Sequence, residues 1–78
     1  MSLKISYMPL EITLVKRRLK KADLKRDLRI SPSTLAKMSR GEYVALEIIV
    51  RICDYLECNV EDVIEVVEDR KYPVKEKS

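Results

Sequence analysis

Three small hydroxyl side chains and a lysine lie within one short stretch of the chain: Ser31, Ser33, Thr34 and Lys37. Positions three and four apart are neighbours on a helix, so Ser33, Thr34 and Lys37 would share one face. Hydroxyls donate and accept hydrogen bonds, and lysine donates to phosphates and to guanine. At a helix N-terminus such side chains approach phosphates and base edges closely. The pattern is therefore suited to binding a polyanion.

The residue types that most catalytic sites need are scarce. The 78 residues include no His and one Gly. Without His, nucleophile pairs of the Ser-His or Cys-His type are excluded, and one Gly cannot build a glycine-rich phosphate loop. A chain of this length rarely encloses a deep pocket in addition to a core. We expect residues 1–78 to form a single-domain binding module that is not an enzyme and needs no cofactor.

The two cysteines, Cys53 and Cys58, are too few for a metal site or a disulfide framework. Zinc needs further Cys or His ligands, and a disulfide scaffold in so short a chain normally needs more cysteines. We expect both thiols to act as small apolar side chains in a reducing cytoplasm. No apolar run approaches the roughly 20 residues that span a bilayer, so a membrane span is not expected.

Charge is divided unevenly along the chain. Residues 1–40 carry 11 Lys and Arg against three acids, a net charge of +8, whereas residues 41–78 carry five against ten, a net charge of −5. A basic half is typical of proteins that bind nucleic acid or an anionic membrane surface. A solvated basic face with no partner is the plainer alternative.

The elements that must position these residues are predicted from apolar spacing and end signals. Ser31 is a good N-cap, Pro32 suits a first helical turn, and Gly41 stands where a left-handed C-cap is wanted. Asn59 and Asp62 have capping-box spacing. The prediction is an all-α fold with five helices at about 9–20, 21–28, 32–40, 45–57 and 60–64, a short antiparallel pairing of residues 3–7 with 65–68, and a frayed tail over 70–78.

The second and third predicted helices are separated by only two or three residues. Two helices of eight or nine residues joined so tightly must cross at a steep angle, which is the geometry of a helix-turn-helix over about residues 21–40. On helix 32–40, Leu35 and Met38 would then face the core. On helix 9–20, Arg17 and Arg18 would face solvent.

Residues 21–41 resemble the helix-turn-helix of the Cro and phage-repressor family, which has the lambda-repressor-like fold. The Leu-Glu-x-x-x-x-Ile-Cys-x-x-Leu run at 46–56 is similar to the family's fourth helix. The Ile-Ser-Pro-Ser-Thr-Leu-Ala-Lys-Met string at 30–38 is similar to a subgroup of small single-domain bacterial members, as is Ile-x-Tyr-x-Pro-Leu at 5–10. The resemblance covers roughly residues 5–67.

The resemblance implies double-stranded DNA as the partner, with the third helix in the major groove. Base edges are expected to meet Ser33 and Lys37, and phosphates are expected to meet Lys21, Ser31, Thr34, Arg40 and Tyr43. Each residue also has a purely structural explanation: Ser31 as a helix cap, Ser33 and Thr34 as ordinary first-turn residues, and Lys37 as a solvated lysine.

Three positions depart from the family pattern. Lys25 stands where a small residue is usual, because the two helices cross closely there. Arg29 stands where Gly is usual in the turn, and a non-Gly residue at positive φ costs on the order of 1 kcal/mol. Pro32 stands where many members carry a base-reading Gln, which leaves the base specificity open.

Two functions follow from the sequence. The first is a sequence-specific, DNA-binding transcriptional regulator that acts as a dimer on a palindromic operator. The second is a protein-interaction module, such as the antitoxin of a toxin–antitoxin pair. The homodimer is expected to form through the last two predicted helices, where Ile48 and Val50 flank the core face, or through the strand edge at 65–68.

Overall fold

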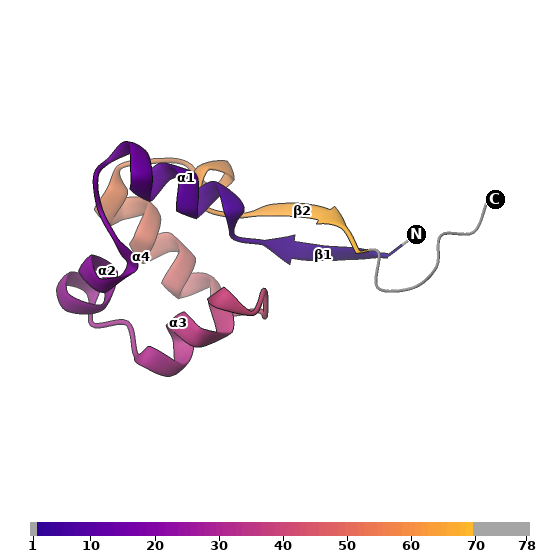
Figure 1. Cartoon of the computed structure of the whole chain (residues 1–78), viewed down its shortest axis with the longest axis horizontal. Coiled ribbons are helices and arrows are strands. Elements are labelled where there is room, and N and C mark those ends of the chain that lie inside the picture. The colour runs from indigo at the N-terminus through magenta and orange to yellow at the C-terminus, as the bar shows by residue number, and fades with distance from the viewer. Residues whose placement is uncertain (1, 70–78) are drawn as a thin grey trace.

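The computed structural model describes residues 2–69, and the predicted tail at 70–78 lies outside them (Figure 1). Four α-helices, one 3-10 turn and a two-stranded sheet make up this part of the chain. In order they are β1 (Leu3–Ser6), α1 (Met8–Lys16), α2 (Lys21–Leu28), α3 (Pro32–Ser39), α4 (Leu46–Leu56), the 3-10 turn η1 (Val60–Asp62) and β2 (Glu65–Glu68).

The hydrophobic core is supplied by every helix. Its buried residues are Tyr7, Leu10, Leu14, Leu24, Ile30, Met38, Ile49, Ile52, Leu56 and Val63. The α4 members recur every three or four residues, as one face of a helix requires. Burial removes this face from water, which stabilises the fold by roughly 1.5–3 kcal/mol per large side chain. One polar group in the core, the Tyr7 hydroxyl, donates to the Glu42 carbonyl at 2.6 Å.

The helix-turn-helix forms as predicted. α2 has the expected bounds, and α3 ends one residue earlier than expected. The Thr34 backbone N–H donates to the Ser31 hydroxyl at 3.2 Å, which confirms Ser31 as the N-cap of α3. Leu24, Ile30 and Met38 anchor α2, the turn and α3 in the core, and this packing holds the two helices in their crossed arrangement.

Each of the four helices is followed within two residues by a residue with a left-handed backbone, and one of these four residues is a glycine. Gly41 at φ +74° ends α3 as predicted, and its N–H donates to Met38 while that of Glu42 reaches back to Lys37. The other left-handed residues are Arg18 (φ 58°), Arg29 (φ 57°) and Glu57 (φ 53°). The turn thus keeps its left-handed form with Arg29, and the strain is tolerated.

The expected strand pairing is present. β1 pairs antiparallel with β2 so that Leu3 lies opposite Glu68 and Ser6 opposite Glu65. The two strands form an arm that extends away from the helices (Figure 1). The backbone of β1 also passes the end of α3, since the Ile5 carbonyl lies beside Gly41.

The first predicted helix, 9–20, is too long. α1 ends at Lys16 because the left-handed Arg18 turns the chain, and the Leu19 N–H then bonds back to the Leu14 carbonyl at 2.8 Å. Arg17 is exposed, as predicted, and it also makes a contact within the fold. Its guanidinium donates to the Leu56 carbonyl at the end of α4.

The fifth predicted helix, 60–64, is wrong as well. Asn59 and Asp62 form the expected capping box, but the turn that follows is the three-residue η1. Val63 is buried and Ile64 is half-buried. Both are β-branched and lead directly into β2, where an extended backbone lets the chain reach β1. Residues 2–69 therefore contain four α-helices.

Candidate nucleic-acid interface

The N-terminus of α3 carries a cluster of three hydrogen-bonded hydroxyls. The Ser31 hydroxyl donates to Thr34 Oγ1 at 3.0 Å and shares a hydrogen bond with Ser33 Oγ at 3.1 Å. Ser31 and Ser33 are exposed and Thr34 is half-buried. The backbone N–H groups of a helix N-terminus attract anions, so this end of α3 presents both dipole and hydroxyl groups to an approaching phosphate.

One turn further along α3, Lys37 is exposed, whereas Met38 is buried and Leu35 is half-buried against the core. The predicted division of α3 into an outer and an inner face is therefore present. The outer face brings Ser33 and Lys37 together, four residues apart on one helix. Both side chains are therefore available to donate hydrogen bonds to a partner outside the fold, with no change in the core.

Lys21 lies at the start of α2, as expected, but its ammonium already has partners. Its Nζ lies 3.1 Å from Glu11 Oε2 on α1 and 3.3 Å from the Ser39 hydroxyl at the end of α3. The pair therefore joins α1, α2 and α3 at one point. Its ammonium lies beside the C-terminal end of α3 and not beside the hydroxyl cluster.

Arg40, in the loop after α3, also has an acidic partner. Its Nε lies 2.7 Å from Glu42 Oε2. The hydrogen bond raises the pKa of the Arg40 guanidinium further above its ordinary value and lowers the pKa of the Glu42 carboxyl. Both groups therefore stay charged at neutral pH. Arg40 and Lys21, the two cations expected to meet phosphates, are both held by carboxylates of this chain.

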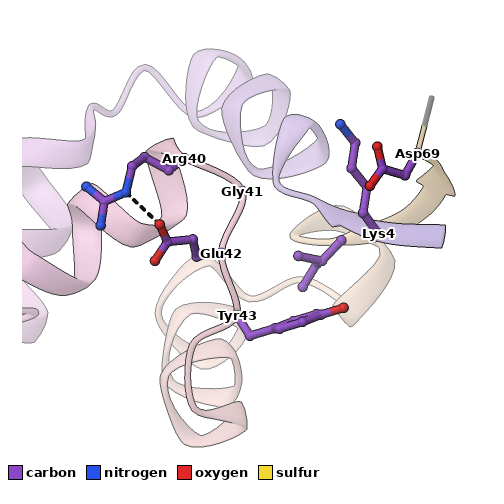
Figure 2. A pocket seen from close by; sticks show the side chains of 7 residues that line it. Lys4, Arg40, Gly41, Glu42, Tyr43 and Asp69 are labelled. Atoms are coloured by element: carbon purple, nitrogen blue, oxygen red, sulfur yellow. Dashed lines mark hydrogen bonds and ion pairs between the residues drawn. The ribbon is translucent and has the colours of Figure 1, made fainter. Parts of the chain in front are cut away.

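Tyr43 follows Arg40 in the loop between α3 and α4. The two side chains leave the loop in opposite directions, and the Tyr43 ring extends toward the strands (Figure 2). Tyr43 is 74% exposed and lines an open groove of about 680 Å³, whose other lining residues are Lys4, Ile5, Arg40, Gly41, Glu42 and Asp69. Arg40 and Tyr43 thus border the same groove with their side chains pointing apart.

The three departures from the family pattern have different consequences. Lys25 is exposed, so the crossing of α2 and α3 does not need to enclose its side chain. Pro32 takes the first position of α3, where its missing N–H costs nothing. Since Pro32 has no side-chain donor, its side chain offers no hydrogen bond to a base edge.

Two residues on α4 that the sequence prediction did not assign hold α2 in place. The Arg51 guanidinium donates to the Leu28 carbonyl at the end of α2, and the Tyr55 hydroxyl donates to Asp27. Asp27 also pairs with Arg26, at 2.8 Å. Its pKa is lowered to about 2, first by the hydrogen bond from Arg26 and then by that from Tyr55. No local sequence pattern predicts these two contacts, because their partners are separated by 23 and by 28 residues in the chain.

Within residues 2–69 no cluster of three or more His, Cys, Asp or Glu is arranged to hold a metal ion. Cys53 and Cys58 are free and half-buried beside the core. The Cys58 N–H donates to the Cys53 carbonyl at 3.0 Å, so the two thiols flank the end of α4. Among the helices described, none combines the length and apolar character needed to cross a membrane.

Comparisons with known proteins agree with this geometry. The sequence model of the Cro/C1-type HTH DNA-binding domain matches residues 10–69. No curated protein sequence matches the chain significantly. Among solved structures, a crystal structure of the transcriptional regulator VanUg (form II) superposes with a TM-score of 0.84 at 35% identity, covering 88% of this chain and 92% of that chain. The chain belongs to the Cro/C1-type helix-turn-helix DNA-binding family.

Proposed function

We propose that this DNA-binding regulator reads a specific sequence by placing α3 in the major groove of double-stranded DNA. The observation that carries the proposal is the outer face of α3, where Ser33 and Lys37 are exposed beside each other. Lys37 suits guanine O6 and N7, and a serine hydroxyl pairs with either a donor or an acceptor. In this role the protein acts by binding in the cytoplasm and catalyses no reaction.

Phosphate contacts would surround this face. Ser31 and Thr34 lie at the N-terminus of α3. Arg40 and Tyr43 follow its other end along the chain, and the Lys21 ammonium lies beside Ser39 at that end. The contacts position the helix and carry no sequence information of their own. DNA binding should therefore weaken steeply with salt, because each lysine or arginine that neutralises a phosphate releases counterions.

The active form would be a homodimer on a palindromic operator. Two surfaces could carry it. On α4, Val50 is 64% exposed and lies one turn from the exposed Leu46, whereas Ile48 packs half-buried against the core. On the arm, β2 pairs with β1 along one edge, and the other edge could accept a second β2. Val50→Glu would disrupt the first interface, and Val66→Pro would disrupt the second.

A random-oligonucleotide selection with the purified full chain tests this function. The expected result is one enriched motif with two half-sites in inverted orientation, their centres about one DNA turn apart. Sedimentation of the protein with the selected duplex should give two chains per duplex. Enrichment of no motif, together with salt-independent binding, would contradict the proposal.

The second candidate function is a protein-interaction module of the antitoxin type. It is favoured by an apolar stripe on α1, where Met8, Ile12 and Val15 are all exposed at helical spacing. Co-expression with the product of a neighbouring gene would separate the two functions. A stable complex that binds no DNA would favour the interaction module.

A further inference from the structure

We propose that Glu11 limits the DNA affinity of this domain by competing with phosphate for the ammonium of Lys21. The inference rests on the proposed function, since it assumes that DNA approaches the α2–α3 side of the molecule. It adds an affinity-determining residue on α1, outside the helix-turn-helix.

The Glu11 carboxylate occupies a position beside the Lys21 ammonium that a bound DNA phosphate would need. Glu11 Oε2 lies 3.1 Å from Lys21 Nζ, and the Ser39 hydroxyl lies 3.3 Å from the same nitrogen. An ammonium has three protons, and these two partners already accept two of them. A phosphate oxygen must either take the third proton, close to a carboxylate of like charge, or displace Glu11.

The solvent exposure of the pair supports displacement. The side chain of Lys21 is 30% exposed and that of Glu11 is 53% exposed. A pair this accessible is a weak stabiliser of the fold, because water and salt screen it. Breaking the ion pair therefore costs little folding stability. The small cost is subtracted from the free energy of DNA binding. The domain therefore binds DNA of any sequence less tightly than it would without the Glu11 carboxylate beside Lys21.

A second cation at the same C-terminal end of α3, Arg40, has the same arrangement. Glu42 holds Arg40 with an Nε–Oε2 distance of 2.7 Å. Two of the cations expected to contact phosphates are thus each paired with one carboxylate of this chain. By contrast, Lys37 on the outer face of α3 has no acidic partner within 4.0 Å among the described residues.

The test is a double-mutant cycle in the full chain, with Glu11→Gln, Lys21→Ala and the double variant titrated against one fixed duplex. At about 50 mM salt, Glu11→Gln should bind about two- to fivefold more tightly than the wild type, the range set by exposed ion pairs. The gain should shrink at about 200 mM salt, because salt screens the pair in the wild type. In the Lys21→Ala background, Glu11→Gln should give no gain.

Glu61→Gln is the matched control, because it removes the same charge from η1, on the far side of the helices from α3 (Figure 1). Circular dichroism checks that each variant is folded. An equal gain from Glu11→Gln with and without Lys21, or the same gain from Glu61→Gln, would show general charge repulsion and overturn the inference. Glu11→Gln binding like the wild type would overturn it too. Failure of the wild type to bind DNA would contradict the proposed function itself.

Discussion

The two ends of α3 are built from different chemistry. The N-terminal end presents neutral hydroxyls that hydrogen-bond to one another over 3.0–3.1 Å, and these bonds fix their orientation. The C-terminal end is flanked by Lys21 and Arg40, each paired with a carboxylate. The first end is preorganised for short-range hydrogen bonds. The second holds charge whose availability depends on salt and on the competing acids.

The comparison predicts that the two ends fail differently when they are mutated. Lys37→Ala, on the outer face of α3, should cost about 1–3 kcal/mol on the best site and much less on unrelated DNA. Lys21→Ala should weaken binding evenly across sequences and flatten the salt dependence by about one unit. Fluorescence anisotropy titrations over a range of salt measure both effects. An even loss from Lys37→Ala would remove the distinction between the two ends.

Ser31→Ala tests the role of the hydroxyl cluster at the N-terminal end of α3. Because Ser31 caps α3, its loss should lower the free energy of unfolding by about 1 kcal/mol, as measured by urea denaturation. Ser33→Ala removes a neighbouring hydroxyl that does not cap the backbone and should leave the stability nearly unchanged. Equal stability of Ser31→Ala and the wild type would show that the cap observed here does not hold the end of α3.

The two left-handed residues on either side of α3 should respond to substitution with opposite signs, and neither effect should exceed that of Ser31→Ala. Gly41→Ala should destabilise by about 1 kcal/mol through its backbone, since an added Cβ would meet only the Ile5 carbonyl at an ordinary 3.9 Å. Arg29→Gly relieves the same strain but adds freedom to the unfolded chain, so we expect a gain of about 0.5 kcal/mol or less. Thermal unfolding of both variants measures the difference. A loss from Arg29→Gly would mean that the arginine side chain itself stabilises the turn.

The smallest expected effect is a pH dependence at the junction of α2 and α4. The pKa of Asp27 is about 2 in the folded chain, below its ordinary 3.8. A lowered folded pKa stabilises the protein above the ordinary value, and that contribution disappears as the pH falls from about 4 to about 2. Tyr55→Phe removes one cause of the lowering, so the Asp27 pKa should rise toward 3.8 in a carbon-detected NMR titration. An unchanged pKa would contradict the hydrogen bond from Tyr55.

The positions of α2 and α3 could be predicted because their ends carry local signals. Ser31, Pro32 and Gly41 each constrain the backbone within one or two residues of where they stand. The start of the predicted helix at 60–64 could be read from a local capping signal. Its end was predicted wrongly because the pairing of β2 with β1, about 60 residues away, decides where the turn stops. α1 ends early because Arg18 is left-handed, and no glycine at this position signals that conformation in the sequence.

The partners of the charged residues could not be predicted in the same way. Lys21 could be placed at the start of α2, but its pairing with Glu11 depends on how α1 packs against α2. The same applies to Arg17, whose partner Leu56 is 39 residues away. Residue type and helical spacing therefore indicate which face of α3 is exposed, while long-range packing decides which cations around it are free.

The central claim is that the outer face of α3 reads the DNA sequence. The most direct test is a random-oligonucleotide selection run in parallel with the wild type, Lys37→Ala and Lys25→Ala, the last being an exposed lysine of α2. We predict that Lys37→Ala returns the wild-type motif with preference lost at one position in each half-site, and that Lys25→Ala returns the motif unchanged. Identical motifs and equal affinities for Lys37→Ala and the wild type would contradict the claim.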